Sequence, residues 1–140
     1  MDIRTFTPGD KQQCLALFDG NMPEFFEQAE RAAFESWLDR PQGSYYVMEH
    51  EGNVVGCGGV ALENPQLASL TWLIVGAGLQ RQGLGKFLVF YCLRSLPPTV
   101  THVRLTTIPA LTGFFEKQGF HVQASSAREV EMIKKLMVCS

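Results

Sequence analysis

Long apolar runs are missing from this sequence of 140 residues. The longest nearly apolar stretch, residues 67–79, is shorter than the ~20 residues that a helix needs to cross a bilayer. The opening residues, MDIRTF, are charged and lack the apolar core of a secretory signal peptide. We therefore expect a cytoplasmic protein that has no membrane partner.

Paired cysteines, clustered histidines and an excess of basic residues are also absent. The three histidines are far apart and no HExxH motif occurs, so no metal site is expected. A formal net charge of −2 argues against sequence-independent binding of nucleic acid, which needs a basic face. The four cysteines form no CxxC pair, so we expect free thiols in a reducing compartment. They are Cys14, Cys57, Cys92 and Cys139.

What the sequence does contain is the composition of one globular domain. Hydrophobic residues make up 46% and charged residues 19% of the chain, which is ordinary for a folded protein. No linker, repeat or low-complexity segment divides it, so a single domain over residues 1–140 is predicted. The spacing of apolar residues predicts the order β-α-α-β-β-β-α-β-α-β-β, a mixed α/β layer architecture.

The same spacing predicts the bounds of the elements. Strands are predicted at residues 2–6, 45–50, 53–62, 67–75, 102–108, 120–123 and 130–136. Helices are predicted after Asp10 as N-cap, over residues 23–38, from residue 84 to a stop at residues 97–98, and over residues 109–118. Gly52 in a tight hairpin and Gly119 as a helix C-cap are the expected turn glycines.

The segment GLQRQGLGKFL, residues 78–88, places glycines between a predicted strand and an amphipathic helix. Glycines leave room for a ligand and let successive backbone N–H groups turn to one side. The helix N-terminus adds the positive end of its dipole, and Arg81 and Lys86 can add charged contacts. This arrangement predicts an anion cradle of the size of a pyrophosphate.

Two familiar phosphate-binding motifs do not fit this segment. A Walker A loop needs glycine where Gln80 stands and Ser or Thr where Phe87 stands, and a Rossmann fingerprint needs glycine in place of Leu88. The pattern Q/R-x-x-G-x-G/A is matched by Gln80, Gly83 and Gly85. On these residues alone, an ordinary glycine turn before a core helix stays an alternative.

Together with the segments around it, the loop resembles the GNAT superfamily of N-acetyltransferases. The resemblance rests on QRQGLG after the strand LASLTWLIV, on LTTIPALTGFFEKQGF at residues 105–120, and on the opening DIRTFTPGD. It covers nearly the whole chain. It implies a GNAT-type fold, with a central, mostly antiparallel sheet flanked by about four helices. It also implies acetyl-CoA as cosubstrate, an amine acceptor and no metal.

The resemblance assigns residues to acetyl-CoA. The backbone of Leu73, Ile74 and Val75 would pair with pantetheine, and an amide there would polarise the thioester carbonyl. Thr107 and Phe114 would flank the CoA arm. The CoA pyrophosphate would be held by the loop residues Gln80, Arg81, Gln82, Gly83, Leu84, Gly85 and Lys86.

The resemblance also places the acceptor pocket at the junction of the first two helices. Glu24 would attract a cationic amine, Phe25 or Phe26 would form a wall, and Trp72 would face either this pocket or the core. The alternative for the same residues is a helix-terminal acid with core aromatics. The sequence does not name the acceptor, which could be a polyamine, an amino acid, an antibiotic or a protein terminus. A homodimer is an open alternative to a monomer.

The catalytic side chains remain unassigned because two positions depart from the family pattern. Phe115 stands where many members carry the tyrosine that protonates the thiolate, and Ser69 stands where a base glutamate often lies. Nearby Glu63 reads as a solvated acid at a strand end. A neutral amine attacking directly in a ternary complex would need another base or a water chain. The main hypothesis is acetyl transfer to a primary amine. The alternative is a weak or inactive GNAT-fold module that binds CoA or a protein partner.

Overall fold

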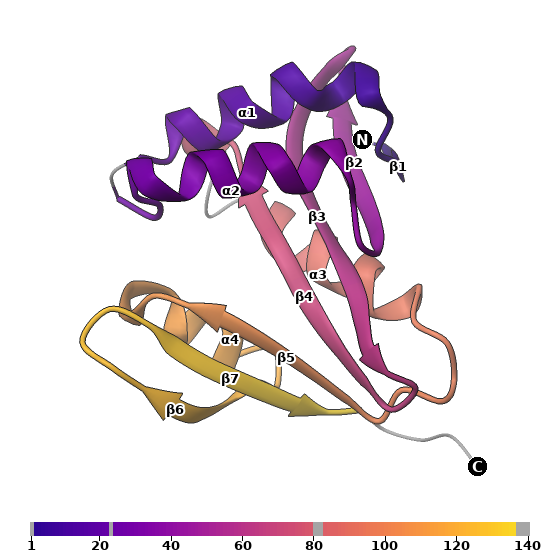
Figure 1. Cartoon of the computed structure of the whole chain (residues 1–140), viewed down its shortest axis with the longest axis vertical. Helices are drawn as coiled ribbons and strands as arrows, with labels where there is room; N and C mark the ends of the chain where they lie inside the picture. Colours follow the sequence, from indigo (N-terminus) through magenta and orange to yellow (C-terminus); the bar gives the residue numbers. More distant parts are fainter. Residues whose placement is uncertain (1, 23, 80–82, 137–140) are drawn as a thin grey trace.

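A seven-stranded sheet in the order β1-β2-β3-β4-β5-β7-β6 forms the centre of the molecule (Figure 1). The computed structural model describes residues 2–22, 24–79 and 83–136, and these residues contain four α-helices. Neighbouring strands are antiparallel except β4 and β5, which run parallel. The predicted mixed, mostly antiparallel sheet flanked by about four helices is confirmed.

The elements follow the predicted order. The strands are β1 (Asp2–Thr5), β2 (Ser44–His50), β3 (Asn53–Asn64), β4 (Leu67–Val75), β5 (His102–Thr107), β6 (His121–Ser125) and β7 (Val130–Lys135). The α-helices are α1 (Lys11–Gly20), α2 (Gln28–Asp39), α3 (Leu84–Arg94) and α4 (Thr112–Glu116). Short 3-10 turns occupy Pro8–Asp10, Ala77–Leu79 and Pro109–Leu111.

The predicted start of the second helix is wrong. Helix α2 begins at Gln28, whereas the apolar spacing placed its start at residue 23, which lies outside the described residues. The backbone N–H of Phe25 donates to the carbonyl of Asn21 at 2.9 Å, which closes a turn after α1. Glu27 is extended, and its N–H donates a hydrogen bond of 3.1 Å to the Glu30 carboxylate as half of a capping box. Both contacts hold the aromatic residues of this segment outside the helix.

The predicted cap of the first helix has another role. Asp10 does precede α1, but its side chain makes no cap hydrogen bond. Its carboxylate instead accepts two hydrogen bonds from the Arg4 guanidinium, both at 2.8 Å, and one from the Thr7 N–H at 2.8 Å. The hydrogen bonds from Arg4 lower the pKa of Asp10 to about 2. The pair therefore ties β1 to the start of α1.

The last predicted helix is divided. The segment predicted as residues 109–118 contains the 3-10 turn Pro109–Leu111 and then α4, which ends at Glu116. Gly119 closes it with a φ of +93°, as its predicted role as a C-cap requires. The hairpin between β2 and β3 likewise turns through Glu51 and Gly52, both with positive φ.

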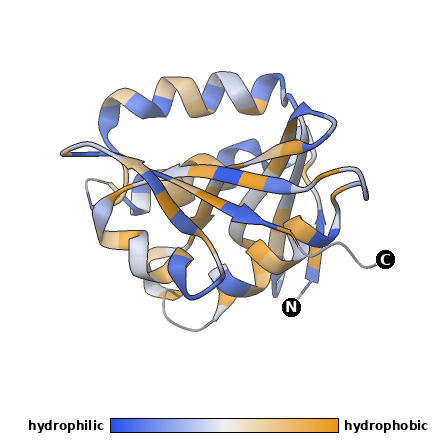
Figure 2. Ribbon diagram, turned by 90° about the horizontal axis from the view of Figure 1, so that it is seen from below, coloured by the Kyte–Doolittle hydropathy of each residue, from blue (hydrophilic) through white to orange (hydrophobic). Residues whose placement is uncertain are grey.

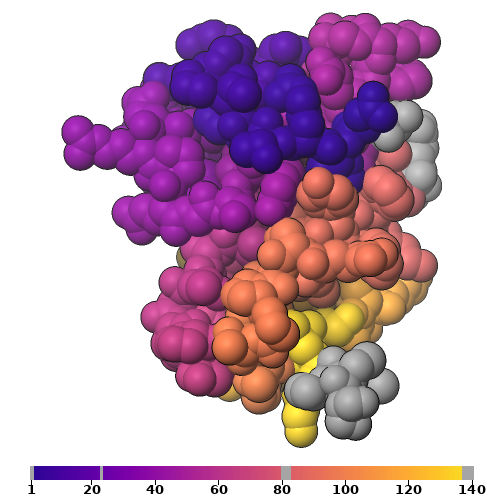
Figure 3. All heavy atoms as spheres, turned by 90° about the vertical axis from the view of Figure 1, so that its right-hand side faces the viewer, coloured from indigo at the N-terminus to yellow at the C-terminus, as the bar shows by residue number. Residues whose placement is uncertain are grey.

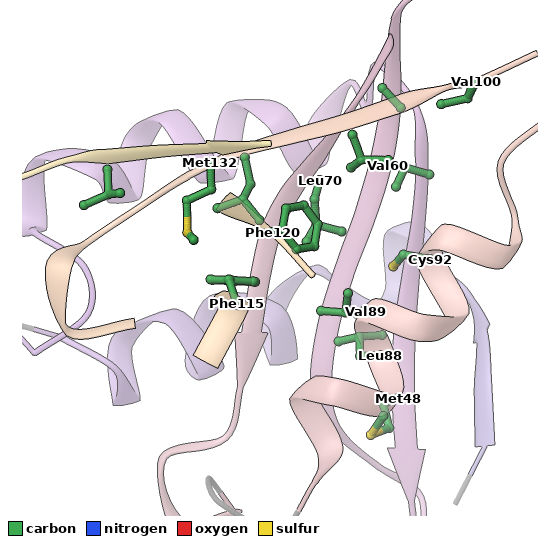
Figure 4. Packing of buried hydrophobic residues seen from close by; sticks show 14 residues of the cluster. Met48, Val60, Leu70, Leu88, Val89, Cys92, Val100, Phe115, Phe120 and Met132 are labelled. Carbon is green, nitrogen blue, oxygen red and sulfur yellow. The ribbon is translucent and has the colours of Figure 1, made fainter. Parts of the chain in front are cut away.

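Two hydrophobic clusters pack against opposite faces of the sheet. Val47 and Met48 are neighbours on β2, and because strand side chains alternate they enter different clusters. The hydropathy pattern in Figure 2 shows this alternation along the strands. On one face α3 contributes Leu88 and Cys92, and α4 contributes Phe115 (Figure 4). The other face carries α1 and α2, with Cys14, Phe18, Phe34 and Leu38 against Tyr45, Cys57 and Ile74.

In Figure 3 the N-terminal segments (indigo and purple) lie at one end of the molecule and the C-terminal strands (orange and yellow) lie at the other. They are joined in the sheet by β4 and β5, whose parallel pairing runs only from Leu67–Ser69 to His102–Arg104. Beyond this short ladder the two strands diverge, so the C-terminal strands lean away from β4 (Figure 1). This divergence positions the candidate site.

Candidate active site

A cleft of about 1680 Å³ opens where β4 and β5 part. One wall is the outer half of β4, from Ser69 to Val75, and the opposite wall is β5 from Arg104 to Thr107, followed by α4. The segment between α1 and α2 lines it from the face of the sheet that carries these two helices, and the start of α3 lines it from the opposite face. The cleft exists because the β4–β5 ladder stops after three residue pairs.

Strand β4 carries a bulge on the wall of this cleft. The pairing of Gly59 with Thr71 and of Cys57 with Ile74 leaves Trp72 and Leu73 opposite Gly58. Trp72 has a φ of +43°, in the left-handed region that a large side chain adopts only under constraint. Its carbonyl accepts a hydrogen bond from the Tyr45 hydroxyl at 2.6 Å. The bulge therefore changes the orientation of the peptide groups at Trp72 and Leu73 relative to a regular strand, in the part of β4 that lines the cleft.

The glycine loop enters α3 beside the end of β4. Gly83 is the N-cap of α3 with a φ of +79°, and its carbonyl accepts the Phe87 N–H at 3.1 Å. A Cβ added to Gly85 would lie 3.0 Å from Cζ of Phe114 and 3.7 Å from Cγ2 of Val75. The first-turn N–H groups of α3 have no partners within the helix, and they carry its positive dipole end. An anion of modest size is the ligand such an opening suits.

The cleft brings together most of the residues predicted for the site. Leu84 and Lys86 belong to the first turn of α3 without lining the cleft, and Gln80, Arg81 and Gln82 lie outside the described residues. The predicted site residues that line it are Glu24, Phe25, Phe26, Trp72, Leu73, Ile74, Val75, Gly83, Gly85, Thr107 and Phe114.

The aromatic residues of the predicted acceptor pocket serve both the cleft and the core. Trp72 lines the cleft, and its ring packs 5.0 Å from Phe34 and 6.4 Å from Phe26, measured between centroids. Phe26 in turn stacks on Phe18 at 4.7 Å. The two alternatives for Trp72, pocket or core, are therefore not exclusive. Glu24 next to them is exposed.

Comparison with known proteins decides the family. The model of the acetyltransferase (GNAT) family matches residues 12–120, more than half of the chain. The chain belongs to the GNAT family of acetyltransferases.

Three solved structures illustrate how widely this GNAT fold is shared. An aminoglycoside 6'-N-acetyltransferase complexed with coenzyme A is 17% identical, with a TM-score of 0.78 over 96% of this chain and 97% of that one. Ard1 from Thermoplasma volcanium is 21% identical, with a TM-score of 0.78 over 97% of each chain. The PaiA N-acetyltransferase from Thermoplasma acidophilum, in complex with coenzyme A, is 14% identical, with a TM-score of 0.78 over 96% and 98%. At these identities the likeness shows the fold.

Ion pairs that the sequence analysis missed border the cleft of this GNAT chain. Arg128, in the turn before β7, reaches Glu27 at the start of α2, with Nη1 and Oε1 3.1 Å apart. Arg104 of β5 pairs with Glu63 and, at 3.8 Å, with Glu131 of β7. The sequence offers one indication of these pairs. Arg104 alternates with Val103 and Leu105, which are buried in β5, and this indicates the face of the strand on which Arg104 lies but not the residues with which it pairs.

Glu63 is not free to act as a base. Its carboxylate accepts a hydrogen bond from the Ser69 hydroxyl at 2.8 Å and two from the Arg104 guanidinium. Burial alone would raise the pKa of Glu63, but the hydrogen bonds from Arg104 and Ser69 outweigh it and hold that pKa below its ordinary value. The expected solvated acid is thus an ion-paired one. Glu63 does not itself line the cleft, but both of its partners, Ser69 and Arg104, do.

The tyrosines lie away from the cleft. Tyr45 is 2% exposed, and the rings of Tyr46 and Tyr91 meet edge-on at 5.1 Å. None of these three tyrosines lines the cleft as the described residues define it. Phe115 does line it, while its ring packs edge-on against Phe114 at 4.9 Å. The absence of a tyrosine proton donor stays a prediction.

Metal and membrane features were also sought over the described ranges. Within them, no group of three or more His, Cys, Asp or Glu side chains is placed to hold a metal ion. The helices of that same part of the chain are too short or too polar to cross a bilayer. Cys14, Cys57 and Cys92 are buried free thiols.

Proposed function

We propose that the chain is a single-domain, cytoplasmic N-acetyltransferase that moves an acetyl group from acetyl-CoA to a primary amine. The observation that carries the proposal is the cleft itself. It joins in one space the stretch of β4 that β5 no longer pairs with and the glycine-led start of α3. Glu24, Glu27 and Glu30 form an acidic rim on the same cleft. Solved relatives of the fold that hold coenzyme A support the choice of cosubstrate.

In this proposal the cosubstrate lies along β4. The pyrophosphate binds the N–H groups at residues 80–86, where a Cβ added to Gly83 would meet no atom within 4 Å. Pantetheine pairs with the backbone of Leu73, Ile74 and Val75, and Thr107 and Phe114 flank it. The amine enters from the opposite face of the sheet, past Glu24, Phe25 and Phe26, with Trp72 beneath it.

The reaction we propose is direct attack in a ternary complex. The neutral amine nitrogen attacks the thioester carbon, the tetrahedral intermediate collapses, and coenzyme A leaves as a thiolate. The free thiol has a pKa of ~8.5, so departure does not require a proton donor. Because Glu63 is held by Arg104, water is the proposed route by which the amine loses its proton.

The proposal is tested by thiol release from acetyl-CoA across a panel of amines. The panel contains polyamines, aminoglycosides, amino acids and peptides with a free terminus, and mass spectrometry identifies the acetylated product. Release that depends on one class of amine is the expected result. The rival, a GNAT module without transfer activity, is favoured by Phe115 and by the engaged Glu63. It predicts coenzyme A binding with no amine-dependent release.

The acidic rim predicts a cationic acceptor. Glu24→Gln should raise the acceptor KM by up to about fivefold, since an exposed ion pair is worth roughly 0.2–1 kcal/mol. The acetyl-CoA KM should stay unchanged because Glu24 belongs to the segment between α1 and α2, on the opposite face of the sheet from α3. Glu51→Gln, which changes an exposed acid in the β2–β3 turn, is the matched control. Equal acceptor KM values for the two variants would make Glu24 only an exposed acid.

The phenylalanine in the tyrosine position allows a gain-of-function test. Phe115→Tyr adds one hydroxyl to a ring that lines the cleft and is 5% exposed. We expect kcat to rise below pH ~8.5, where a donor assists the thiolate, and to match wild type above it. General acid catalysis is worth ~10²–10⁴-fold where it operates, so the rise should be easy to measure. A flat ratio of kcat values at every pH, with unchanged Tm, would show that thiolate departure is not assisted.

A further inference from the structure

We propose that Tyr45 is a positioning residue for acetyl transfer. Its hydroxyl fixes the Trp72–Leu73 peptide so that the Leu73 N–H faces the opening between β4 and β5. The inference rests on the proposed function and deepens it, because it assigns to Tyr45 the role of aiming the backbone donor to the thioester oxygen. Tyr45 itself does not line the cleft.

The Tyr45 side chain reaches β4 from two strands away. Tyr45 lies on β2, directly opposite Gly59 of β3. A Cβ on Gly59 would lie 2.7 Å from Cδ1 of Tyr45 and 2.1 Å from the carbonyl oxygen of Ser44. Since Gly59 has no side chain, the ring passes across β3, and its hydroxyl meets the Trp72 carbonyl at 2.6 Å.

The direction of the Leu73 N–H follows from peptide geometry. In a planar trans peptide, the C=O of one residue and the N–H of the next point in opposite directions. The Trp72 carbonyl points back toward Tyr45 and the β2–β3 side of the strand. The Leu73 N–H therefore points toward β5. The β4–β5 ladder ends at Ser69, so at Leu73 this direction leads into the cleft.

The surroundings of Trp72 hold this peptide in place. A non-glycine residue with a φ of +43° persists only where neighbouring contacts over-determine it. Trp72 is held by its ring contact with Phe34 at 5.0 Å and by the hydrogen bond from Tyr45. The Tyr45 ring is itself fixed by Trp37, with centroids 4.8 Å apart. The Trp72–Leu73 peptide is therefore already fixed in its orientation before a ligand binds.

Tyr45 acts as a hydrogen-bond donor and not as an acid. Burial raises the pKa of Tyr45 well above its ordinary value, so the hydroxyl keeps its proton throughout the range of an enzyme assay. Its hydrogen bond to Trp72 is therefore constant with pH.

The chemistry needs one donor at the oxygen. When the amine nitrogen bonds to the carbonyl carbon, the π electron pair moves to the oxygen, which gains negative charge. The C–S bond then breaks, the thiolate departs, and the ammonium proton passes to water. An N–H already aimed at that oxygen stabilises the charge without reorganisation.

The test compares Tyr45→Phe with Tyr46→Phe. The first removes the hydroxyl that holds Trp72 and keeps the ring, while the second removes a hydroxyl from a neighbouring ring that packs on Tyr91. Because loss of a whole oxyanion donor costs ~10²–10³ in kcat, we expect Tyr45→Phe to lower kcat by about tenfold or more. Affinity for coenzyme A, which lacks the acetyl group, should be unchanged in both variants.

A spectroscopic measurement separates positioning from general damage to the fold. Isotope-edited infrared spectra of acetyl-CoA labelled at the carbonyl should show a lower stretching frequency on wild type than in water. In Tyr45→Phe the frequency should return toward the value in water, while Tyr46→Phe keeps the wild-type value. If Tyr45→Phe does not fold, the wild-type spectrum still decides, because an unshifted carbonyl overturns the proposed donor.

The two proposals fail in different ways. Unchanged kcat and carbonyl frequency in a folded Tyr45→Phe, beside an active wild type, overturn the role of Tyr45 and leave acetyl transfer standing. If wild type acetylates no amine, the proposed function fails. A crystal structure of ligand-free Tyr45→Phe then decides the positioning claim alone: a rotated Trp72–Leu73 peptide supports it, and an unmoved peptide overturns it.

Discussion

Gly85→Asp is expected to weaken acetyl-CoA binding by at least tenfold, on the order of 1.4 kcal/mol. Gly85 lies in the first turn of α3, where the proposed pyrophosphate meets the helix N-terminus. A carboxylate there would repel the phosphates, and its Cβ would press against the Phe114 ring. Calorimetric titration of the folded variant with acetyl-CoA measures the effect.

Gly85→Ala is the matched control for the added bulk. Its Cβ meets the same Phe114 ring at 3.0 Å, so both variants strain this contact equally. The difference in affinity between alanine and aspartate then reports the negative charge. If Gly85→Asp binds acetyl-CoA as tightly as Gly85→Ala, no anion is bound at the start of α3.

The second large effect is on stability. Gly59→Ala should lower the free energy of unfolding by about 3 kcal/mol or more, the upper range of overpacking in a core. The new methyl group would lie 2.1 Å from the Ser44 carbonyl oxygen and 2.9 Å from Cα of Tyr45, both of them backbone atoms on the neighbouring strand. Backbone cannot yield as a flexible side chain does, so β2 and β3 must separate. Urea denaturation monitored by circular dichroism gives the value.

Gly20→Ala is the control for this substitution. Gly20 ends α1, no atom lies within 4 Å of a Cβ added there, and its φ is not positive. Replacing a glycine at such a position stabilises by ~0.4–1 kcal/mol, mainly by restricting the unfolded chain. If Gly59→Ala proved as stable as Gly20→Ala, the crossing of Tyr45 over β3 would be wrong.

The order of the elements could be predicted because their apolar periods are local. Strand β4 matches its predicted bounds, residues 67–75. Its bulge could not be read from LASLTWLIV, in which no residue type marks positions 72 and 73. The positive φ of Trp72 comes from contacts with Tyr45 and Phe34, distant in sequence.

The start of α2 was mispredicted for a similar reason. Phe25 and Phe26 continue the helical spacing of the residues after them, yet Phe26 is partly buried and stacks on Phe18 from an irregular segment. The spacing of aromatic residues indicates which of them are buried, but a residue can be buried without belonging to a helix.

The ion pairs that border the cleft join residues far apart in the chain, so they could not be predicted from local sequence. Glu63 and Arg104 are separated by 41 positions, and Glu27 and Arg128 by 101. The glycine loop was different, because a single segment there supplies both the turn and the helix start, Gly83 and Gly85. Gly83 and Gly85 of this segment line the cleft, and their binding of an anion stays a prediction.

A crystal structure of the chain with acetyl-CoA is the most direct test of the account. We expect the pyrophosphate at the start of α3, beside Gly83 and Gly85, and the pantetheine arm between β4 and β5. The thioester oxygen should lie about 2.9 Å from the Leu73 nitrogen, an ordinary hydrogen-bond distance. Acetyl-CoA bound outside this cleft, or with its carbonyl turned away from Leu73, would contradict the account.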